Sequence, residues 1–342
     1  MEESIFLVQP GIYKSQGRNS ITINGLALDC TGSTFEFAAF CKGDVTLGIY
    51  VDAPDSYENQ LYFTVYNDGQ LLGPREKYKF GGTGKREFVI AQDLEEGYHT
   101  FSIVRQNESE TGEFCIKYIM LTGRLQTPPR ERERYIEFVG DSITTGIGNL
   151  YTPETWDPNV DPKSKVYQDG TQTYGLLAAR KLRADYSVVA QQGIGIICGW
   201  QPHTMLDTYE MTCYQRNRRD DWNFIRQPDF TVINLGSNDS DKIEENGKTF
   251  EDVRAGAVRL SNIIRSHYPS TGIVWATGMI GQQMCPYIRR AVEDLGGAAN
   301  RCYYLQLESD TAGGGSHPSL VGQRRNAEIL YDFLKSLYDE QN

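Results

Sequence analysis

The sequence is poor in the residues that build metal sites and disulfide scaffolds. Only four of its 342 residues are histidines, and no two of them stand three or four positions apart. The seven cysteines are odd in number, scattered, and never spaced as CxxC. A histidine-rich zinc site therefore has no ligand set, and we expect no catalytic metal. The cysteines are expected to be reduced and mostly buried thiols.

Long apolar runs and an excess of positive charge are also missing. No apolar run reaches the length that crosses a bilayer. A net charge of -11 disfavours binding to nucleic acid or to an anionic membrane. The N-terminal stretch MEESIFLVQPGIY has no positive region followed by an apolar core, so it does not resemble a secretory signal. The sequence thus predicts a cytoplasmic protein without a membrane or nucleic-acid partner, and it indicates no oligomeric state.

The periodicity of the first part of the chain is that of β-strands. Residues 1–126 contain short β-rich runs separated by turn residues, with no convincing helical period. STFEFAAF and VTLGIYV are two of these runs, and each is expected to be a separate strand. This pattern predicts an all-β sandwich, most like a jelly roll. Residues 127–134 combine two prolines with charges of alternating sign, which predicts a solvated linker between two domains.

The remainder of the chain, residues 135–342, alternates strand and helix. The predicted strands are 135–139, 186–190, 229–236, 272–278 and 302–308, and the predicted helices are around 172–183, 249–267, 285–297 and 318–338. Strands and helices at this spacing predict a parallel sheet of about five strands with helices on both faces. In such sheets ligands bind beyond the carboxyl ends of the strands.

A serine stands directly after the first strand of this second half. In the stretch YIEFVGDSITTG, from Tyr135 to Gly146, an apolar strand runs into a polar turn that carries Ser142. Gly140 allows the chain to turn sharply there. A serine at this position is a candidate nucleophile, provided that a base removes its proton.

Histidine is the usual base for such a serine. His317 lies in the loop GGGSHPS before the last predicted helix and, like Ser142, follows a predicted strand. His99 falls in the sandwich half, His267 ends a helix, and His203 is in a loop near the possible cleft. We therefore select His317 as the candidate base.

Two further strand ends offer hydrogen-bond donors for a developing oxyanion. The strand at 186–190 runs into Gln191-Gln-Gly193, where Gly193 presents its backbone N–H without steric obstruction. The strand at 229–236 runs into a Ser-Asn-Asp turn that contains the Asn238 amide. An Asn-Asp pair after a strand is commonly only a capping turn, but this is the third polar turn at the same sheet edge.

These residues carry a family resemblance. The segments GDSI, QG, GSND and SHP, in this order and behind predicted strands, resemble the four blocks of the SGNH or GDSL-type hydrolases, which have a flavodoxin-like α/β fold. The resemblance covers roughly residues 133–342. It implies that Ser142 is the nucleophile and His317 the base. It also implies an oxyanion hole made by the N–H groups of Ser142 and Gly193 and by the Asn238 side chain, with no cofactor.

The first half of the chain narrows the resemblance to one family of these hydrolases. A β-sandwich joined by a proline-containing linker to GDSIT resembles carbohydrate esterase family 2, whose members remove acetyl groups from xylan and mannan. The resemblance implies a carboxylate two or three residues before the histidine, but the sequence has Gly314, Gly315 and Ser316 there. We favour a Ser/His dyad in which a backbone carbonyl orients His317; the alternatives are orientation by a more distant residue such as Asp310 and a degraded site.

The insertion at 149–170 follows the candidate nucleophile directly and either shapes a substrate cleft or is a variable surface loop. Trp156 within it and Trp200 are candidate sugar-stacking residues, although packing is an equally good interpretation. The glycines near Ser142 match neither GxGxxG nor GxxxxGK[ST], so a nucleotide site is not expected.

Together these features predict a serine esterase that removes O-acetyl groups from carbohydrates such as xylan, mannan or their oligosaccharides. A GDSL-type lipase or thioesterase acting on another acyl ester is one alternative. The other is a non-catalytic carbohydrate-binding protein with a degraded site, because sandwiches often bind sugars. Glycoside hydrolysis is disfavoured, since an acidic protein offers paired carboxylates by chance.

Overall fold

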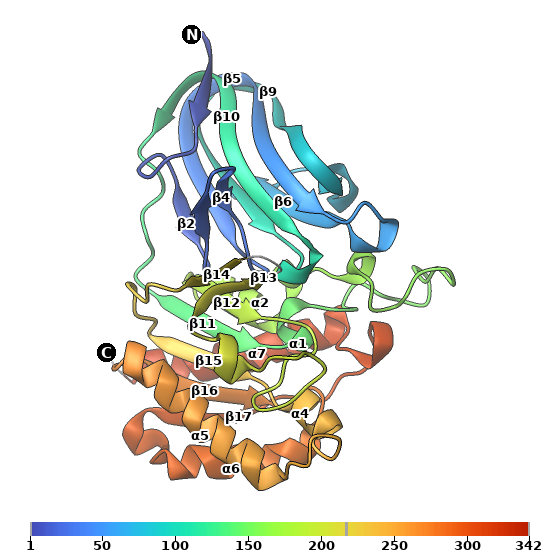
Figure 1. Ribbon diagram of the computed structural model, residues 1–342. Coiled ribbons are helices and arrows are strands. Elements are labelled where there is room, and N and C mark those ends of the chain that lie inside the picture. Colours follow the sequence, from blue (N-terminus) through green and yellow to red (C-terminus); the bar gives the residue numbers. More distant parts are fainter. Residues whose placement is uncertain (1, 216–217, 341–342) are drawn as a thin grey trace. The chain divides into compact units, whose positions relative to one another are not determined.

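The computed structural model describes residues 2–215 and 218–340. The chain forms two compact units, Met1–Glu131 and Arg132–Asn342. In Figure 1 the first unit is drawn from blue to green and consists mainly of strands, whereas the second runs from green to red and mixes strands with helices. None of the helices in the described ranges is both long enough and apolar enough to span a membrane. All seven cysteines are buried, and none of them forms a disulfide in the described part of the chain.

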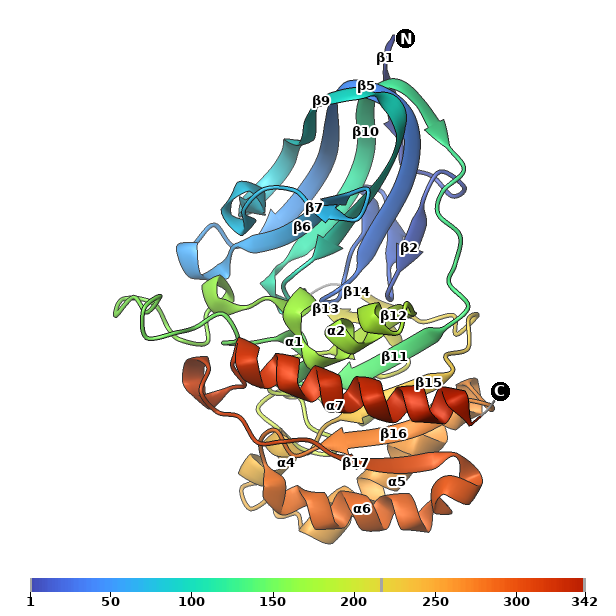
Figure 2. The same cartoon turned by 180° about the vertical axis from the view of Figure 1, so that it is seen from behind.

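The first unit is built on antiparallel strand pairs in the order β3-β4-β10-β5-β9-β6-β7, with β1 on β10, β2 on β5 and β8 on β6. Three of its strands, β5, β9 and β10, are long and curved (Figures 1 and 2). The strand bounds are β1 Glu3–Leu7, β2 Lys14–Gln16, β3 Ser20–Thr22, β4 Gly25–Ala27, β5 Thr34–Ala53, β6 Leu61–Asn67, β7 Gln70–Leu71, β8 Lys79–Phe80, β9 Gly82–Arg105 and β10 Glu113–Gln126.

The sequence-based division into short strands was wrong where the structure has one long strand. The runs STFEFAAF and VTLGIYV, expected as two strands, are one continuous strand, β5. The residues between them, Lys42 to Asp44, are a bend with register shifts against β9 and not a turn that reverses the chain. Alternate β5 residues on both sides of this bend face a single core, as Phe37 and Leu47 illustrate. The predicted all-β sandwich is confirmed.

The second unit contains a five-stranded parallel sheet in the order β12-β11-β15-β16-β17. The strands are β11 Tyr135–Gly140, β12 Asp185–Ala190, β15 Phe230–Asn234, β16 Gly272–Thr277 and β17 Cys302–Gln306. The helices are α1 Ser142–Thr145, α2 Tyr174–Lys181, α3 Met205–Thr208, α4 Ser237–Lys242, α5 Phe250–His267, α6 Cys285–Asp294 and α7 Leu320–Asp339. The predicted α/β domain with a sheet of about five parallel strands is therefore confirmed. The hairpin β13 (Met211–Gln215) and β14 (Arg218–Asp221) was not anticipated.

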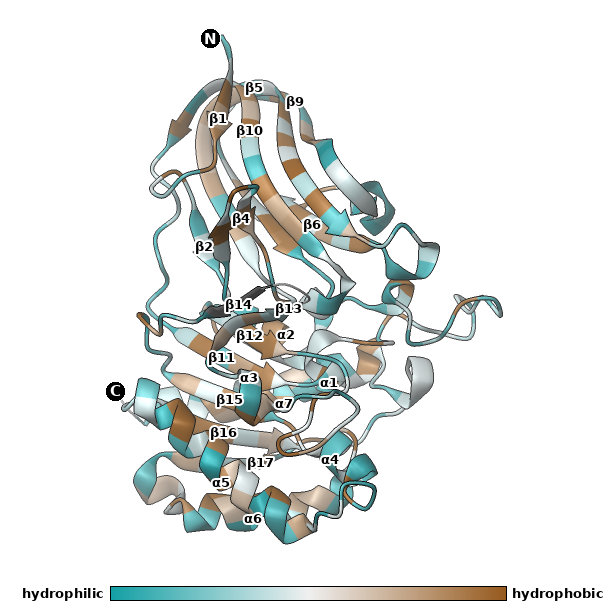
Figure 3. Cartoon of the chain, in the orientation of Figure 1, coloured by the Kyte–Doolittle hydropathy of each residue, from teal (hydrophilic) through white to brown (hydrophobic). Residues whose placement is uncertain are grey.

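Both faces of the parallel sheet are covered by helices, and this burial explains the nearly continuous apolar composition of its strands. Phe138 packs on the face shared with α2 and α7. Its neighbour Val139 packs on the opposite face with residues of α5 and α6. Figure 2 shows α7, in red, lying along one face of the sheet, and Figure 3 shows the brown, apolar strands β11, β15 and β16 between the helices.

The central strands end at the same level, which matters for function. Gly140 at the end of β11 pairs with Ala190 of β12 and with Asn234 of β15. The turns that follow these three strands therefore begin at one edge of the sheet. They are the turns that carry Ser142, Gly193 and Asn238.

Candidate active site

Ser142 opens the short helix α1 directly after β11. The turn depends on Gly140, because a Cβ at that position would lie 2.0 Å from the Thr144 hydroxyl oxygen. Asp141 caps the helix, and its Oδ1 accepts a hydrogen bond from Ile143 N at 2.9 Å. Ser142 is 6% exposed, so its hydroxyl lies in a largely desolvated position at the sheet edge.

His317 meets Ser142 across 175 positions of sequence. Its Nε2 lies 2.9 Å from Ser142 Oγ, and its Nδ1 lies 3.1 Å from the carbonyl oxygen of Gly315. A carbonyl oxygen only accepts, so Nδ1 must carry the proton that it donates to Gly315. Nε2 is then left with a free lone pair that accepts the serine proton. This is the tautomer that a general base needs.

Two backbone N–H groups at this edge are available to a ligand. In the described part of the chain, the N–H groups of Ser142 and Gly193 donate to no protein acceptor. Gly193 has a φ of +78°, and a Cβ there would stand 3.0 Å from the Trp200 Cβ. Glycine at 193 thus meets two requirements, a left-handed backbone and close approach of a neighbouring chain segment.

The Asn238 amide is fixed by two acceptors. Its Nδ2 donates to Ile194 O at 2.9 Å and to Asp141 Oδ2 at 3.2 Å. The shorter bond ties the turn after β15 to the turn that follows Gly193. The longer one ties it to the residue that precedes Ser142. The amide nitrogen is therefore held at the sheet edge and does not rotate freely.

Two buried aspartates that sequence reasoning did not select connect these turns. Asp141 accepts from Ser237 Oγ at 2.6 Å as well as from Asn238, and burial raises the pKa of its carboxyl to about 6. Asp239 accepts from the backbone N–H groups of Ile196 and Ile197, both at 2.8 Å. Burial also raises the pKa of Asp239, although these hydrogen bonds oppose the effect. The sequence feature that could have identified these two aspartates is that one stands directly beside Ser142 and the other directly beside Asn238.

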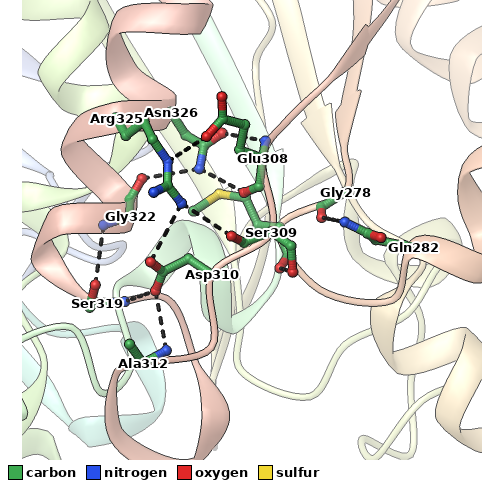
Figure 4. A network of polar contacts seen from close by, with 11 residues as sticks. Gly278, Gln282, Glu308, Ser309, Asp310, Ala312, Ser319, Gly322, Arg325 and Asn326 are labelled. Atoms are coloured by element: carbon green, nitrogen blue, oxygen red, sulfur yellow. Dashed lines mark hydrogen bonds and ion pairs between the residues drawn. The ribbon is translucent and has the colours of Figure 1, made fainter.

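The structure places Asp310 away from the imidazole. Its Oδ1 accepts hydrogen bonds from Ser319 N at 2.8 Å and from Ala312 N at 3.3 Å, and its Oδ2 lies 3.6 Å from Arg325 (Figure 4). These contacts engage the loop backbone and helix α7. The carbonyl of Gly315, and not the Asp310 carboxylate, is the group found at His317 Nδ1.

The insertion at 149–170 packs against the glycine-rich loop that carries His317. Gly314 N donates to the carbonyl oxygen of Gly148, the residue directly before the insertion, at 2.9 Å. A Cβ on Gly314 would lie 2.0 Å from the carbonyl oxygen of Pro162, and one on Gly315 would lie 2.4 Å from the Lys163 Cγ. A side chain of any kind, including a carboxylate, is therefore excluded at position 314 and crowded at position 315. The close packing of the insertion therefore accounts for glycine at position 314, where the resemblance implied an acid.

The two candidate stacking residues are both solvent-exposed. Trp200 is 63% exposed, its backbone N–H donates to Gly193 O at 2.8 Å, and Lys242 Nζ lies 3.6 Å from the centroid of its ring. It therefore stands beside the Gly193 turn. Trp156, which is 51% exposed, lies within the insertion. Among the residues of the described ranges, no group of three or more histidine, cysteine or acidic side chains is arranged to hold a metal ion.

The family model of the GDSL-like lipases/acylhydrolases matches residues 136–309. The chain belongs to this family. The matched range begins in β11 and contains Ser142, Gly193 and Asn238, whereas His317 lies just beyond it.

Curated relatives of this family member cover both units of the chain. It is 28% identical over 296 residues to the cellulase/esterase CelE of Acetivibrio thermocellus, a match that covers 80% of this chain and 34% of the relative. The chain thus spans about a third of that relative's length. It is 27% identical over 257 residues to an acetylxylan esterase / glucomannan deacetylase of Cellvibrio japonicus, which covers 71% of this chain and 68% of that protein.

Solved structures share the complete fold. An acetyl xylan esterase, Est2A, from Butyrivibrio proteoclasticus superposes with a TM-score of 0.84 at 20% identity and covers 99% of both chains. A family two carbohydrate esterase from Clostridium thermocellum, solved in complex with cellohexaose, has a TM-score of 0.83 at 24% identity. That match covers 96% of this chain and 99% of the other. A chain with both of these folds, the β-sandwich and the α/β domain, is thus found in known structures.

Asp141→Asn should have opposite effects on stability and on activity. Because the pKa of Asp141 rises from 3.8 to about 6 on folding, the folded chain binds this proton more tightly than the unfolded chain. The stabilisation is present below the unfolded pKa and is lost as the pH rises through about 6. At neutral pH the buried, ionised carboxylate costs on the order of 3 kcal/mol, which a neutral asparagine avoids.

We therefore expect the stability of Asp141→Asn, relative to wild type, to improve between about pH 4 and pH 7 in thermal unfolding. Ester hydrolysis should fall nevertheless, because the new NH2 group can face the donor Nδ2 of Asn238. Asp241→Asn, at an exposed residue of α4, is the matched control and should show neither effect. A stability difference that does not vary with pH would contradict the assignment.

Gly314→Ala should disrupt the site through backbone contact alone. The added Cβ meets the Pro162 carbonyl, which is main chain and cannot rotate away. We expect a loss of about 1–3 kcal/mol in unfolding free energy and, because His317 is displaced, a loss of turnover of roughly 10²-fold. Gly97→Ala is the control, since a Cβ on that glycine would meet no atom closer than 3.6 Å. Full activity in Gly314→Ala would show that the loop tolerates a side chain.

Proposed function

We propose that this protein is a serine esterase that removes O-acetyl groups from carbohydrates through an acetyl-enzyme on Ser142. The observation that carries the proposal is the 2.9 Å contact between Ser142 Oγ and His317 Nε2 in a member of the GDSL-like hydrolase family. A nucleophile and a base within hydrogen-bond distance are the minimum for acyl transfer by a serine. The sandwich, residues 1–126, is the accessory domain in this proposal, and residues 135–342 are the catalytic domain.

Acylation begins when Ser142 Oγ attacks the acetyl carbonyl carbon and its proton passes to His317 Nε2. The charge that develops on the carbonyl oxygen is stabilised by the N–H groups of Ser142 and Gly193 and by Asn238 Nδ2. The tetrahedral intermediate collapses as the bond to the sugar oxygen breaks. His317 gives its proton to that oxygen, so the sugar leaves as an alcohol and the acetyl group stays on Ser142.

Deacylation repeats these steps with water. His317 Nε2 takes a proton from water, the resulting hydroxide attacks the acetyl carbon, and the bond to Ser142 Oγ breaks. The proton returns from His317 to Ser142, and acetate leaves. The hydrogen bond from Nδ1 to the Gly315 carbonyl keeps the imidazole oriented throughout, which suits a Ser/His dyad. No step requires a cofactor.

The substrate class rests on the relatives and on the exposed aromatics. Proteins named acetylxylan esterase / glucomannan deacetylase match most of this chain. Trp200 stands beside Gly193 with more than half of its surface exposed. An exposed indole at that place offers a flat face on which a sugar ring can stack. We therefore propose acetylated xylan, mannan or their oligosaccharides as the substrates.

We also propose that the protein works in the cytoplasm. Seven buried cysteines that form no disulfide in the described structure suit a reducing compartment, where disulfide formation is disfavoured. Its substrates there would be short acetylated oligosaccharides.

Hydrolysis of acetyl esters by the wild type and by Ser142→Ala tests the proposal. We expect the wild type to release acetate from 4-nitrophenyl acetate and from acetylated mannan or xylan. Turnover by Ser142→Ala should fall by 10³-fold or more, since the nucleophile is lost. Equal rates for the two proteins would sink the assignment. A preference for long acyl chains in a chain-length series would instead support a lipase or thioesterase, and sugar affinity without acetate release would support a carbohydrate-binding protein.

Asn238→Ala should weaken the oxyanion hole specifically. Removing one donor typically costs about 10² to 10³-fold in turnover, with little effect on KM. Asn246→Ala is the matched control, because Asn246 also donates its side-chain amide to a backbone carbonyl, Lys242 O at 2.8 Å, but is exposed. The measurement is kcat and KM on 4-nitrophenyl acetate for both variants. Wild-type turnover in Asn238→Ala would remove this residue from the oxyanion hole.

A further inference from the structure

The loop that carries His317 connects β17 to α7 and is anchored at its beginning by α7. Asn326 in α7 pairs with both backbone groups of Glu308: its Oδ1 accepts from Glu308 N at 2.8 Å, and its Nδ2 donates to Glu308 O at 3.0 Å. Asp310 N donates to Met279 O, beyond the end of β16, at 3.2 Å. The loop therefore leaves the sheet in a fixed direction (Figure 4).

Asp310 connects the beginning of this loop to its end. A single oxygen, Oδ1, accepts from Ala312 N at 3.3 Å and from Ser319 N at 2.8 Å. Ser319 is the N-cap of α7, and its own hydroxyl accepts from Gly322 N at 3.1 Å. The Asp310 side chain, 10% exposed, thus closes the loop on the first turn of the helix, two residues after His317.

The sequence of α7 makes room for this carboxylate. A Cβ on Gly322 would lie 2.3 Å from the Asp310 Cγ, so only glycine lets the side chain rest on the helix. Arg325, one turn further, reaches Asp310 Oδ2 at 3.6 Å and donates to Ser309 O at 3.1 Å. Glycine has a low helix propensity and so destabilises the first turn of a helix. The position of the Asp310 carboxylate accounts for glycine at position 322.

Inside the closed loop, the backbone sets the imidazole. Gly313 N donates to His317 O at 2.8 Å, and the Gly315 carbonyl receives the hydrogen bond from Nδ1. The position of Nε2 relative to Ser142 therefore follows from the position of the loop. A displacement of about 1 Å at a reacting group can reduce turnover by roughly 10²-fold.

We propose that Asp310 is a positioning residue for His317, acting as a clamp that closes the base-bearing loop onto α7 and not as the carboxylate that orients the imidazole. This inference rests on the proposed esterase function. It assigns Gly322 a supporting part, because the clamp needs the space that glycine leaves.

Two substitutions at Asp310 separate the clamp from an electrostatic role. Asp310→Asn keeps an oxygen that accepts from Ala312 N and Ser319 N but removes the charge. Asp310→Ala removes the acceptor as well. With a clamp, kcat on 4-nitrophenyl acetate should stay within about threefold of wild type in Asp310→Asn and fall about 10- to 100-fold in Asp310→Ala, with KM little changed. Glu308→Gln, which removes only the exposed carboxylate beside Arg325, is the control.

The pH profile of kcat/KM gives a second readout. If the Asp310 charge acted on the imidazole, its removal would lower the pKa of the imidazolium and move the acidic limb to lower pH. The clamp predicts an unmoved limb in Asp310→Asn. A shifted limb, or a full loss of turnover in Asp310→Asn, would overturn the clamp in favour of the electrostatic role. Wild-type turnover in Asp310→Ala would overturn it outright.

Gly322→Ala keeps the test decisive if Asp310→Ala does not fold. Alanine is the better helix former, yet its Cβ would displace the carboxylate, so we expect a fall in kcat without a fall in melting temperature. Unchanged kcat in Gly322→Ala would contradict the clamp. These outcomes are distinct from failure of the proposed function, in which the wild type itself would release no acetate.

Discussion

The register of the parallel sheet is the constraint on which the site depends. Because Gly140 pairs with both Ala190 and Asn234, the central strands end level. The turns after them must share one edge. A slip of one residue in either pairing would turn the side chains of that strand to the opposite face. The apolar residues on both faces, such as Phe138 and Val139, oppose that slip through burial. Packing far from the chemistry thus sets the position of Ser142, Gly193 and Asn238.

The packing around the loop before His317 is incompatible with an acid at position 314. The insertion at 149–170 brings the Pro162 carbonyl so close to Gly314 that no Cβ fits between them. A chain that gained this contact could not keep a carboxylate at position 314. The Gly315 carbonyl takes over the hydrogen bond to Nδ1. A backbone acceptor is only as rigid as the loop to which it belongs. The orientation of His317 therefore depends on the contacts that hold this loop in place, and not on a single side chain.

The sequence predicted the fold class, the five parallel strands and the long helices, because each gives a clear period in apolar residues. It also selected Ser142 and His317, which the structure brings into contact. The sequence did not reveal structural roles that depend on contacts between residues far apart in the chain. The Lys42–Asp44 stretch has the composition of a turn, but pairing with β9 keeps it within one continuous strand that bends there. For the group that orients His317, Asp310 was one of the alternatives, but its carboxylate binds the first turn of α7, and the favoured alternative, a backbone carbonyl, lies at His317 Nδ1. Asp141 and Asp239 show their importance only through the backbone and side-chain donors that converge on them.

Asp141 illustrates how a pre-organised site comes at the expense of stability. Its carboxylate is buried, and its described partners are neutral donors: Ile143 N, Ser237 Oγ and Asn238 Nδ2. Burial without a cation raises its pKa, so the folded state carries an electrostatic penalty at neutral pH. In return, one residue fixes the turn that presents Ser142 and the amide of Asn238. The Asn238 contact to Asp141 is the longer of its two, so a developing oxyanion competes with the weaker acceptor. The amide can then serve the reaction without releasing Ile194 O, and the turns stay in place while charge develops.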